Sequence, residues 1–454
     1  MFLTIEKLVY GGDGLARLPA NPAGPGKAVF VPFVLGGEAV DAAITEQKPG
    51  FARAQAGSIV APSPYRVQPA CSYFGACGGC QYQHASYHHQ LEIKKEILRE
   101  SLRRTAKLEL EVGIEVHPSP PWGYRNRSRF QLQTAPLKPK PGLNGPPEFA
   151  AGYFKMGSRQ LLAVEQCPIS SALINRGLSA LWRSGRSGKV PAGVQEVEFF
   201  ANAEDSQLLV EVSSTAEARR AGLRAWAEDL LASMPEMKGV VVFKKTSFGG
   251  RNELEKWLTV GLDHLIYRTQ RAAYRVSAGS FFQTNRHLTD ELVRLVTGGQ
   301  SGELALDLYA GVGLFSTALG DFHHIVSVES SQTSTADLAY NQGSNGKAVQ
   351  ATTEQFLAGA EDAGAAGKGS ILPHIHHRPE LVVVDPPRSG LGERVARMLV
   401  TLDAPRVVYV SCDPVTLARD LVPMLSAGYR VEQMHLVDLF PQTYHVETVV
   451  QLVR

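Results

Sequence analysis

This chain of 454 residues has no long apolar run, little net charge and few cysteines, and each of these limits the class of protein to which it can belong. No run of eighteen or more apolar residues occurs, and Met1–Lys7 lacks the basic start and apolar core of a signal peptide, so we expect a cytoplasmic protein that does not enter membranes. The formal net charge is only +2, which by itself does not indicate a nucleic-acid partner. Only five cysteines are present, and in a reducing compartment they are metal ligands or catalytic groups rather than disulfides.

The distribution of charge is more informative than its sum. Residues 66–140 hold twelve Lys or Arg against six Glu and no Asp. Within this segment Arg125, Arg127 and Arg129 alternate, so on a strand they would share one face. Such a face suits a row of phosphates, and it equally suits the ordinary polar side of a half-buried sheet. The segment raises the odds of a polyanionic partner modestly.

The hydrophobic pattern predicts three domains. Residues 1–65 form short strands between glycine and proline turns, which suggests a small β-barrel of the oligonucleotide-binding (OB) type or a β domain without a binding role. Residues 66–275 contain a helix from Ser86 to about Lys107, most of whose charges we expect to face solvent, and then mixed strands and helices of an α+β domain. Residues 276–454 alternate apolar strands and helices, which is typical of a Rossmann-like α/β sheet.

Four of the cysteines form a candidate metal site. Cys71, Cys77 and Cys80 lie within ten residues among glycines, and Cys167 follows far along the chain. Zinc sites usually use two separated close pairs, whereas three local thiolates and one distant thiolate are common for iron–sulfur clusters. We therefore favour an iron–sulfur cluster over zinc. Because all four ligands come from the protein, its role is expected to be structural.

The carboxyl-terminal third has the pattern of a nucleotide-like ligand site. A strand over 304–308 runs into a turn with Gly311 and Gly313 and then a helix start, and the next strand ends in Glu329, a carboxylate suited to ribose hydroxyls. A further strand over 381–384 ends in Asp385. Since parallel strands end at one edge of a sheet, these groups are expected to meet there.

A possible nucleophile follows the next strand. Cys412 comes after the apolar run Val407–Val410 and before a helix, whose N-terminus would stabilise a thiolate. A buried cysteine that only fills space is the alternative. A strand beginning near Val446 would bring Glu447 toward the same edge. Three histidines, His374, His376 and His377, occupy an apparent surface loop and are a weak metal candidate.

Several ordered motifs together resemble the RNA uridine-C5 methyltransferase family. They are Phe30-Val31-Pro32 with Gly37-Glu38, the four cysteines, Phe281-Phe282-Gln283-Thr284-Asn285, Asp385-Pro386-Pro387-Arg388, Ser411-Cys412-Asp413-Pro414 and His445-Val446-Glu447. Leu314 departs from the family's usual asparagine, and Gly36 from its usual proline. The resemblance implies an amino-terminal TRAM domain, a 4Fe-4S cluster, and a class I methyltransferase domain that binds S-adenosylmethionine through Gln283, Tyr309, Gly311, Glu329 and Asp385.

The resemblance also implies a mechanism and a partner. Cys412 would add to carbon 6 of a uracil so that carbon 5 can accept the methyl group, and Glu447 would then remove the carbon-5 proton. The expected partner is RNA, ribosomal RNA being favoured and transfer RNA possible, and the enzyme is expected to be a monomer. An RNA cytosine-C5 methyltransferase and a non-catalytic RNA-binding iron–sulfur protein are the alternatives.

Overall fold

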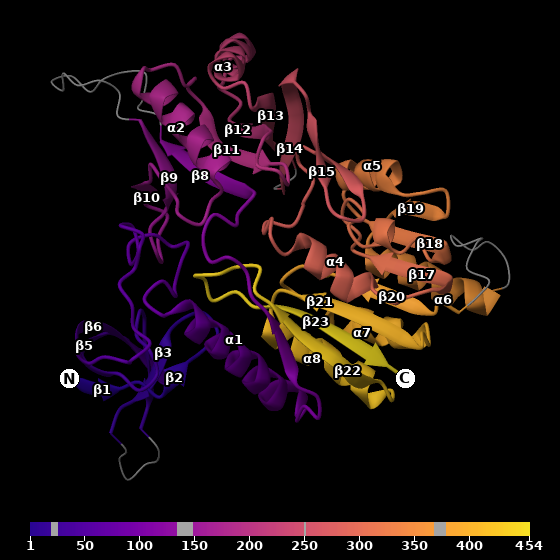
Figure 1. Cartoon of the computed structure of the whole chain (residues 1–454), viewed down its shortest axis with the longest axis horizontal. Helices are drawn as coiled ribbons and strands as arrows, with labels where there is room; N and C mark the ends of the chain where they lie inside the picture. Colours follow the sequence, from indigo (N-terminus) through magenta and orange to yellow (C-terminus); the bar gives the residue numbers. More distant parts are fainter. Residues whose placement is uncertain (20–25, 134–148, 249–250, 367–377) are drawn as a thin grey trace.

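The computed structural model describes residues 1–19, 26–133, 149–248, 251–366 and 378–454. Three large sheets follow one another along the chain, and Figure 1 shows them as an indigo, a magenta and an orange-to-yellow layer. No helix within the described ranges is long and apolar enough to cross a bilayer.

The amino-terminal sheet has six strands in the order β1-β5-β6-β4-β3-β2. Alternate side chains along β4 and β5 are buried, as the period of a half-buried strand requires, and Val29, Val31 and Val40 meet in a small core. Sequence reasoning missed the short strand β3. The bounds are β1 Phe2–Thr4, β2 Lys7–Leu8, β3 Gly14–Arg17, β4 Ala28–Val31, β5 Ala39–Gln47 and β6 Phe51–Ala61.

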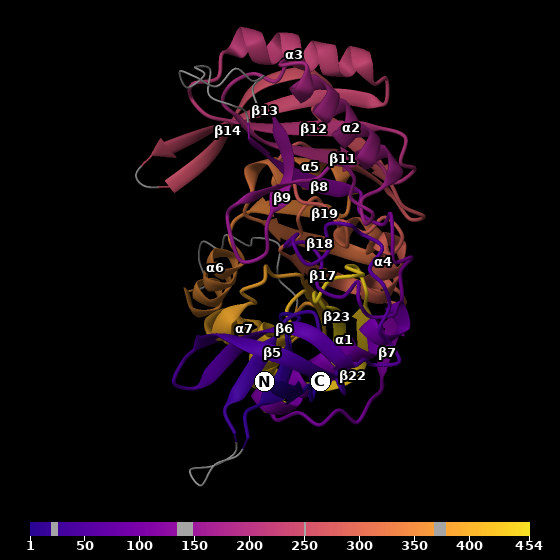
Figure 2. The ribbon, with the colours of Figure 1, turned by 90° about the vertical axis from the view of Figure 1, so that its left-hand side faces the viewer.

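The central sheet has seven strands in the order β10-β9-β8-β11-β12-β13-β14. Two helices, α2 (Ala172–Arg186) and α3 (Arg220–Ser233), pack on one of its faces through a shared hydrophobic core, and Figure 2 shows α3 along the top of the molecule. The expected α+β segment is therefore present. The strands are β8 Arg127–Gln133, β9 Ala150–Phe154, β10 Leu161–Ala163, β11 Val194–Ala201, β12 Leu208–Ser214, β13 Met237–Phe248 and β14 Arg251–Gly261.

The carboxyl-terminal sheet has eight strands in the order β19-β18-β17-β20-β21-β23-β22-β7. The strands from β19 to β21 are parallel, and β23 is antiparallel to both its neighbours. Apolar side chains cover both faces, which explains the near-continuous apolar runs in these strands. The strands are β7 Ile114–His117, β17 Gly302–Leu308, β18 Phe322–Glu329, β19 Gly346–Gln350, β20 Leu381–Val384, β21 Arg406–Ser411, β22 Arg430–Val437 and β23 Glu447–Val453.

The helices of this region are α4 Thr289–Thr297, α5 Gln332–Asn341, α6 Thr353–Ala366, α7 Gly392–Thr401 and α8 Pro414–Ser426, and a hairpin of β15 (His264–Arg268) and β16 (Ala273–Ser277) precedes them. The helix expected after the glycine turn of Gly311 and Gly313 is only a 3-10 turn, Ser316–Ala318.

Helix α1 (Tyr87–Ser101) and strand β7 join the carboxyl-terminal layer although they lie early in the chain. Leu98 and the following π-helical turn, Leu102–Ala106, pack into the core of the eight-stranded sheet, and β7 pairs in parallel with β22. The expectation that the charges of α1 face solvent is wrong for Lys94. Its ammonium is buried and pairs with buried Asp438 at 2.5 Å. Burial lowers the pKa of Lys94, and the Asp438 carboxylate opposes that shift.

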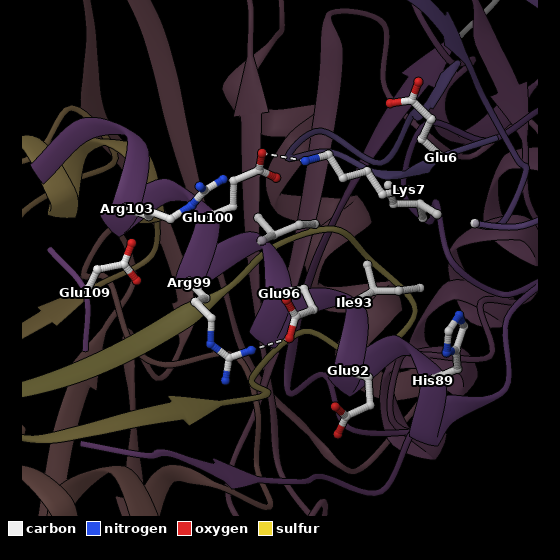
Figure 3. A pocket seen from close by; sticks show the side chains of 13 residues that line it. Glu6, Lys7, His89, Glu92, Ile93, Glu96, Arg99, Glu100, Arg103 and Glu109 are labelled. Atoms are coloured by element: carbon white, nitrogen blue, oxygen red, sulfur yellow. Dashed lines mark hydrogen bonds and ion pairs between the residues drawn. The ribbon is translucent and has the colours of Figure 1, made fainter. Parts of the chain in front are cut away.

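A cavity of about 390 Å³ separates α1 from the amino-terminal sheet (Figure 3). Lys7 spans it and donates to Glu100 at 2.5 Å, and Arg99 pairs with Glu96. Its acidic lining residues outnumber the basic ones, since Glu6, Glu92, Glu96, Glu100 and Glu109 face Lys7, Arg99 and Arg103. This cavity therefore does not suit RNA phosphates.

Candidate active site

The carboxyl ends of four parallel strands bring the predicted functional residues to one edge of the sheet. Tyr309 follows β17, Glu329 ends β18, Asp385 follows β20 and Cys412 follows β21. The register of β21 against β23 pairs Ser411 with Thr448, so the next position along each strand places Cys412 opposite Glu447. These five residues thus meet at the edge of the sheet where open α/β folds bind their ligands.

A small cavity of about 30 Å³ at this edge is lined by four of the five residues predicted to bind the cofactor: Gln283, Tyr309, Gly311 and Asp385. The fifth, Glu329, lies beside the same turn, where its carboxylate accepts hydrogen bonds from the N–H groups of Gly311 (3.0 Å) and Ser331 (2.6 Å). These contacts fix the carboxylate while leaving lone pairs for hydroxyl donors. Tyr309 has φ 64°, a left-handed conformation that is uncommon for a non-glycine residue and often marks a functional site.

Two carboxyl groups near this cavity lack a cation among the described residues. Asp307 is fully buried, and burial raises its pKa to about 7 although its carboxylate accepts from the Ser316 N–H at 3.0 Å. Burial, and then the charge of Asp307, raise the pKa of Asp385 to about 7. A positively charged ligand at Asp385 would relieve this cost, which fits the sulfonium of S-adenosylmethionine.

Cys412 is half-buried between β21 and α8, and its thiol is not activated in the way that we expected from the sequence. Burial first, then the nearby carboxylates of Glu447 and Asp385, raise its pKa to about 12. The N-terminus of α8 does not compensate, because Asp413 caps it and accepts from the N–H groups of Val415 (2.9 Å) and Thr416 (3.0 Å). The free site therefore holds a neutral thiol.

Glu447 is buried at the start of β23 rather than exposed on an edge strand. Burial, and then Asp385, hold its pKa well above the usual range, and Arg388 opposes that shift. Arg388 itself contacts His445 Nε2 at 3.3 Å, and its charge adds to burial in lowering the pKa of His445 to about 3. A protonatable carboxyl group and a guanidinium thus lie near the cysteine, and the guanidinium contacts a neutral imidazole.

The four predicted cluster ligands line a second cavity of about 120 Å³, and none of the residues that line it also lines the cavity at the sheet edge. Cys71, Cys77 and Cys80 come from the loop before α1, and Cys167 comes from the segment before α2. The Gly79 N–H points at Cys77 Sγ at 3.4 Å. Among the described residues, one group of three potential metal ligands has its donor atoms within 4.8 Å of one another, and this group contains no cysteine. It follows that no three of the four sulfurs are this close together.

The row of alternating arginines does not form an open phosphate-binding face. Arg127 is largely buried, stacks on Phe200 with 4.4 Å to the ring centroid and lies 3.5 Å from Glu198, and Arg129 pairs with the same carboxylate at 2.8 Å. Arg125 instead lines the cysteine cavity. The acidic partners lie on neighbouring β11, so the local sequence of β8 did not reveal them. His374, His376 and His377 lie outside the described residues.

Sequence reasoning missed Tyr10, which reaches the site from the amino-terminal sheet. Burial and the neighbouring Asp413 carboxylate raise its pKa, and Cys412 contributes to that shift. Its ring packs edge-on against Tyr444 with 5.5 Å between centroids. No local pattern connects residues 10 and 412, so only the tertiary fold could show this contact.

The raised pKa of Cys412 predicts how alkylation should depend on pH. For the free enzyme, the rate of Cys412 modification by iodoacetamide should rise about tenfold per pH unit from about pH 7 to about pH 9 without a plateau, because the thiolate fraction keeps rising below the pKa. Peptide mass spectrometry would separate Cys412 from the other four cysteines. A plateau near neutral pH would contradict the high pKa.

The comparisons with known proteins agree with this arrangement. Residues 86–454 match the family model of tRNA (Uracil-5-)-methyltransferase, and residues 2–56 match the TRAM domain. An uncharacterized RNA methyltransferase of Aquifex aeolicus is 32% identical over 99% of this chain and 97% of its own length. The 23S rRNA (uracil(1939)-C(5))-methyltransferase RlmD of Pseudomonas fluorescens is 30% identical over 98% and 92%.

Among solved structures, the chain is similar to the Pyrococcus abyssi tRNA (uracil-54, C5)-methyltransferase in complex with S-adenosyl-L-homocysteine, with a TM-score of 0.71, 22% identity and 99% of each chain covered. This likeness supports the class I methyltransferase fold. With the family model covering most of the sequence, the chain belongs to the S-adenosylmethionine-dependent RNA uracil-C5 methyltransferases.

Proposed function

We propose that this enzyme methylates carbon 5 of a uridine in ribosomal RNA through a transient bond between Cys412 and carbon 6. The observation that carries the proposal is the placement of Cys412 opposite buried Glu447, beside the cavity that holds Gln283, Tyr309 and Asp385. Bound there, S-adenosylmethionine supplies an electrophilic methyl group on a positively charged sulfur.

Cys412 has the first task. Carbon 5 of uracil is a weak nucleophile, and addition of the Cys412 thiolate to carbon 6 turns the ring into an enolate whose carbon 5 can attack the methyl group. Since the free thiol has a pKa of about 12, its proton must leave when the substrates bind. A cationic ligand beside Asp385 would ease this ionisation, because the carboxylates of Glu447 and Asp385 add to burial in raising the pKa of Cys412.

Glu447 has the second task. After methyl transfer, carbon 5 carries both the methyl group and its original proton, and a base must take that proton before the carbon–sulfur bond can break. The Glu447 carboxylate lies opposite Cys412 and is desolvated, so it is a stronger base than a carboxylate in water. Removal of the proton restores the ring double bond and expels the Cys412 thiolate.

A groove of about 970 Å³ offers a path for RNA to this site. Its lining includes residues of the amino-terminal sheet and the cysteine loop, and also Tyr10 and Tyr444, which pack against each other. The Cys412 thiol acts on the pKa of Tyr10, which places this side of the groove near the proposed nucleophile. Phe30, Phe33 and Arg53 also line it. Aromatic faces suit unstacked bases, and the target uridine must leave its stack to reach the thiol.

Ribosomal RNA is proposed because the relative from Pseudomonas fluorescens, which aligns over nearly the whole chain, is named for 23S rRNA. The structurally similar tRNA enzyme shares less sequence and supports the fold alone. Since Cys412, Glu447 and the cofactor cavity come from one chain, we propose that the enzyme acts as a monomer.

We also propose that Cys71, Cys77, Cys80 and Cys167 hold a 4Fe-4S cluster. A tetrahedral zinc ion with Zn–S bonds of about 2.3 Å brings its sulfurs to roughly 3.8 Å from one another, whereas a four-iron cluster holds them much farther apart. The pattern of three local thiolates and one distant thiolate, all lining one cavity, supports the cluster. It would tie the loop before α1 to the segment before α2.

The choice of RNA can be tested with purified enzyme. Radiolabelled methyl groups should enter 23S rRNA transcripts and appear as 5-methyluridine by mass spectrometry, with little transfer to tRNA transcripts, since we propose a ribosomal target. Exclusive labelling of tRNA would overturn the choice of RNA while leaving the chemistry intact.

Replacement of the proposed base should trap the intermediate. Glu447→Gln should lower turnover by roughly 10²–10⁴-fold and accumulate a denaturation-resistant protein–RNA adduct, because glutamine cannot accept the carbon-5 proton. Gel electrophoresis under denaturing conditions measures the adduct. Glu432→Gln, at an exposed glutamate on β22, is the matched control and should behave as wild type. An E447Q enzyme that turns over normally without adduct would assign the base elsewhere.

The cluster prediction can be tested with Cys412 as the control, because Cys412 is the cysteine outside the four proposed ligands. Anaerobically purified enzyme should contain about four iron ions and show broad visible absorbance, which Cys80→Ser should remove and Cys412→Ser should keep. Stoichiometric zinc without iron in the wild type would refute the cluster.

A further inference from the structure

A group of histidines and glutamates at the outer edge of the eight-stranded sheet is not used by the proposed chemistry. Glu115 and His117 lie on β7, and His435 lies on neighbouring β22, in register with Glu115. Strand β23 lies between β22 and β21, the strand that leads to Cys412. Glu291 of α4 contacts the group from the adjacent helix.

The donor atoms of three of these residues converge. His117 Nε2 lies 3.1 Å from His435 Nδ1, Glu115 Oε2 lies 3.3 Å from His435 Nδ1, and Glu115 Oε1 lies 3.8 Å from His117 Nε2. With metal–ligand bonds of about 2.0–2.1 Å, tetrahedral coordination separates ligand atoms by roughly 3.3 Å. The three separations bracket that value.

The outer nitrogens of both imidazoles are already engaged as donors. His117 Nδ1 faces the Glu291 carboxylate at 2.8 Å, and a carboxylate can only accept, so this nitrogen carries the proton. His435 Nε2 faces Gln433 Oε1 at 3.1 Å and takes the same role. Each neutral ring then presents a bare lone pair to the other, and 3.1 Å between two lone pairs is repulsive without a cation between them.

The surroundings favour a metal ion over a shared proton. Both rings are buried, so a bound cation would be largely shielded from water. Glu115 and Glu291 supply negative charge, and Arg294 pairs with Glu291 at 2.7 Å on the far side. A ligating histidine whose other N–H donates to a carboxylate or an amide oxygen is the usual arrangement around protein-bound zinc.

We propose that Glu115, His117 and His435 bind a divalent transition-metal ion of the zinc class, with Glu291 and Gln433 orienting the two imidazoles. Imidazole nitrogen disfavours Mg²⁺ and Ca²⁺, which prefer oxygen ligands. Glu115 is 65% exposed, so solvent can supply a further ligand and the ion can enter without unfolding.

The ion would fasten the edge strand to the sheet. β7 and β22 have only four paired positions, and two ligands on one strand and one on the other add a bond across that short ladder. The chain continues from β22 through Asp438, whose N–H donates to the His117 carbonyl at 3.0 Å, toward Glu447. Metal binding is therefore expected to stabilise the fold, with the chemistry left to Cys412 and Glu447.

The test must distinguish metal binding at this histidine–glutamate site from metal binding at the four cysteines. Enzyme with its cysteine site loaded, treated with chelator and titrated with Co²⁺, should bind one further equivalent whose visible spectrum lacks a thiolate charge-transfer band. His435→Gln should lose this equivalent. Glu115→Gln, at an exposed position that the fold tolerates, should weaken binding at least tenfold, and Glu291→Gln should weaken it by about 10–100-fold. Zn²⁺ should raise the unfolding temperature of wild type and not of H435Q.

His323→Gln is the matched control, because His323 is an exposed histidine that also faces a glutamate, Glu303, at 3.7 Å. It should bind as wild type does. Equal Co²⁺ binding by wild type, H435Q and E115Q would overturn the proposal. A wild-type enzyme that takes up no ion beyond its cysteine site would also overturn it, and the two rings would then share a proton.

Discussion

Several acidic groups share the buried edge of the eight-stranded sheet, and their burial, reinforced by their mutual repulsion, governs the protonation state of the site. Asp307, Asp385, Glu447 and Cys412 all have pKa values raised by burial, and for most of them a neighbouring acid raises the value further. At neutral pH such a site retains protons until a cation arrives. Under the proposed function, a sulfonium bound beside Asp385 would couple cofactor binding to thiol ionisation, because it would offset the carboxylate charges that add to burial in raising the pKa of Cys412.

A second requirement is that the loop between β22 and β23 stays in place, since it leads to Glu447. Contacts from distant parts of the chain fix it: Lys94 pairs with Asp438, the Asn285 amide donates to the Leu439 carbonyl at 3.0 Å, and the Tyr124 hydroxyl donates to the Pro441 carbonyl at 3.0 Å. Removing one partner of the buried Lys94–Asp438 pair would leave an unpaired charge in the interior. The amino-terminal half thus positions the carboxyl-terminal site.

Local patterns in the sequence predicted the elements that carry the site. Apolar strands that end in Glu329, Asp385 and Cys412 were legible because parallel strands buried on both faces have continuous apolar runs. The matched family model confirms the resemblance drawn from the motifs. The domain boundaries and the roles of individual site residues stay predictions. The early chain contributes α1 and β7 to the carboxyl-terminal layer, which no hydrophobic pattern could indicate.

What the sequence could not show depends on partners far away in the chain. The sequence left open whether Arg127 faces phosphate or the polar side of a sheet, and Glu198 on the adjacent strand favours the second. Lys94 was expected to be exposed, but it pairs with Asp438 inside the protein. The N-terminus of α8 does not activate Cys412 as expected, and here the cause is local in the sequence. The adjacent Asp413 caps the helix and accepts hydrogen bonds from its free N–H groups. Each error concerns a charge whose environment is set by tertiary contacts.

The bond between sulfur and the pyrimidine ring is the central claim, and 5-fluorouridine tests it most directly. Fluorine at carbon 5 cannot leave as a proton, so enzyme incubated with S-adenosylmethionine and fluorouridine-substituted RNA should stop at a covalent adduct. Proteolysis and mass spectrometry should place the modified nucleotide on the peptide that contains Cys412. An adduct on another residue, or methylated RNA released without any adduct, would contradict the account.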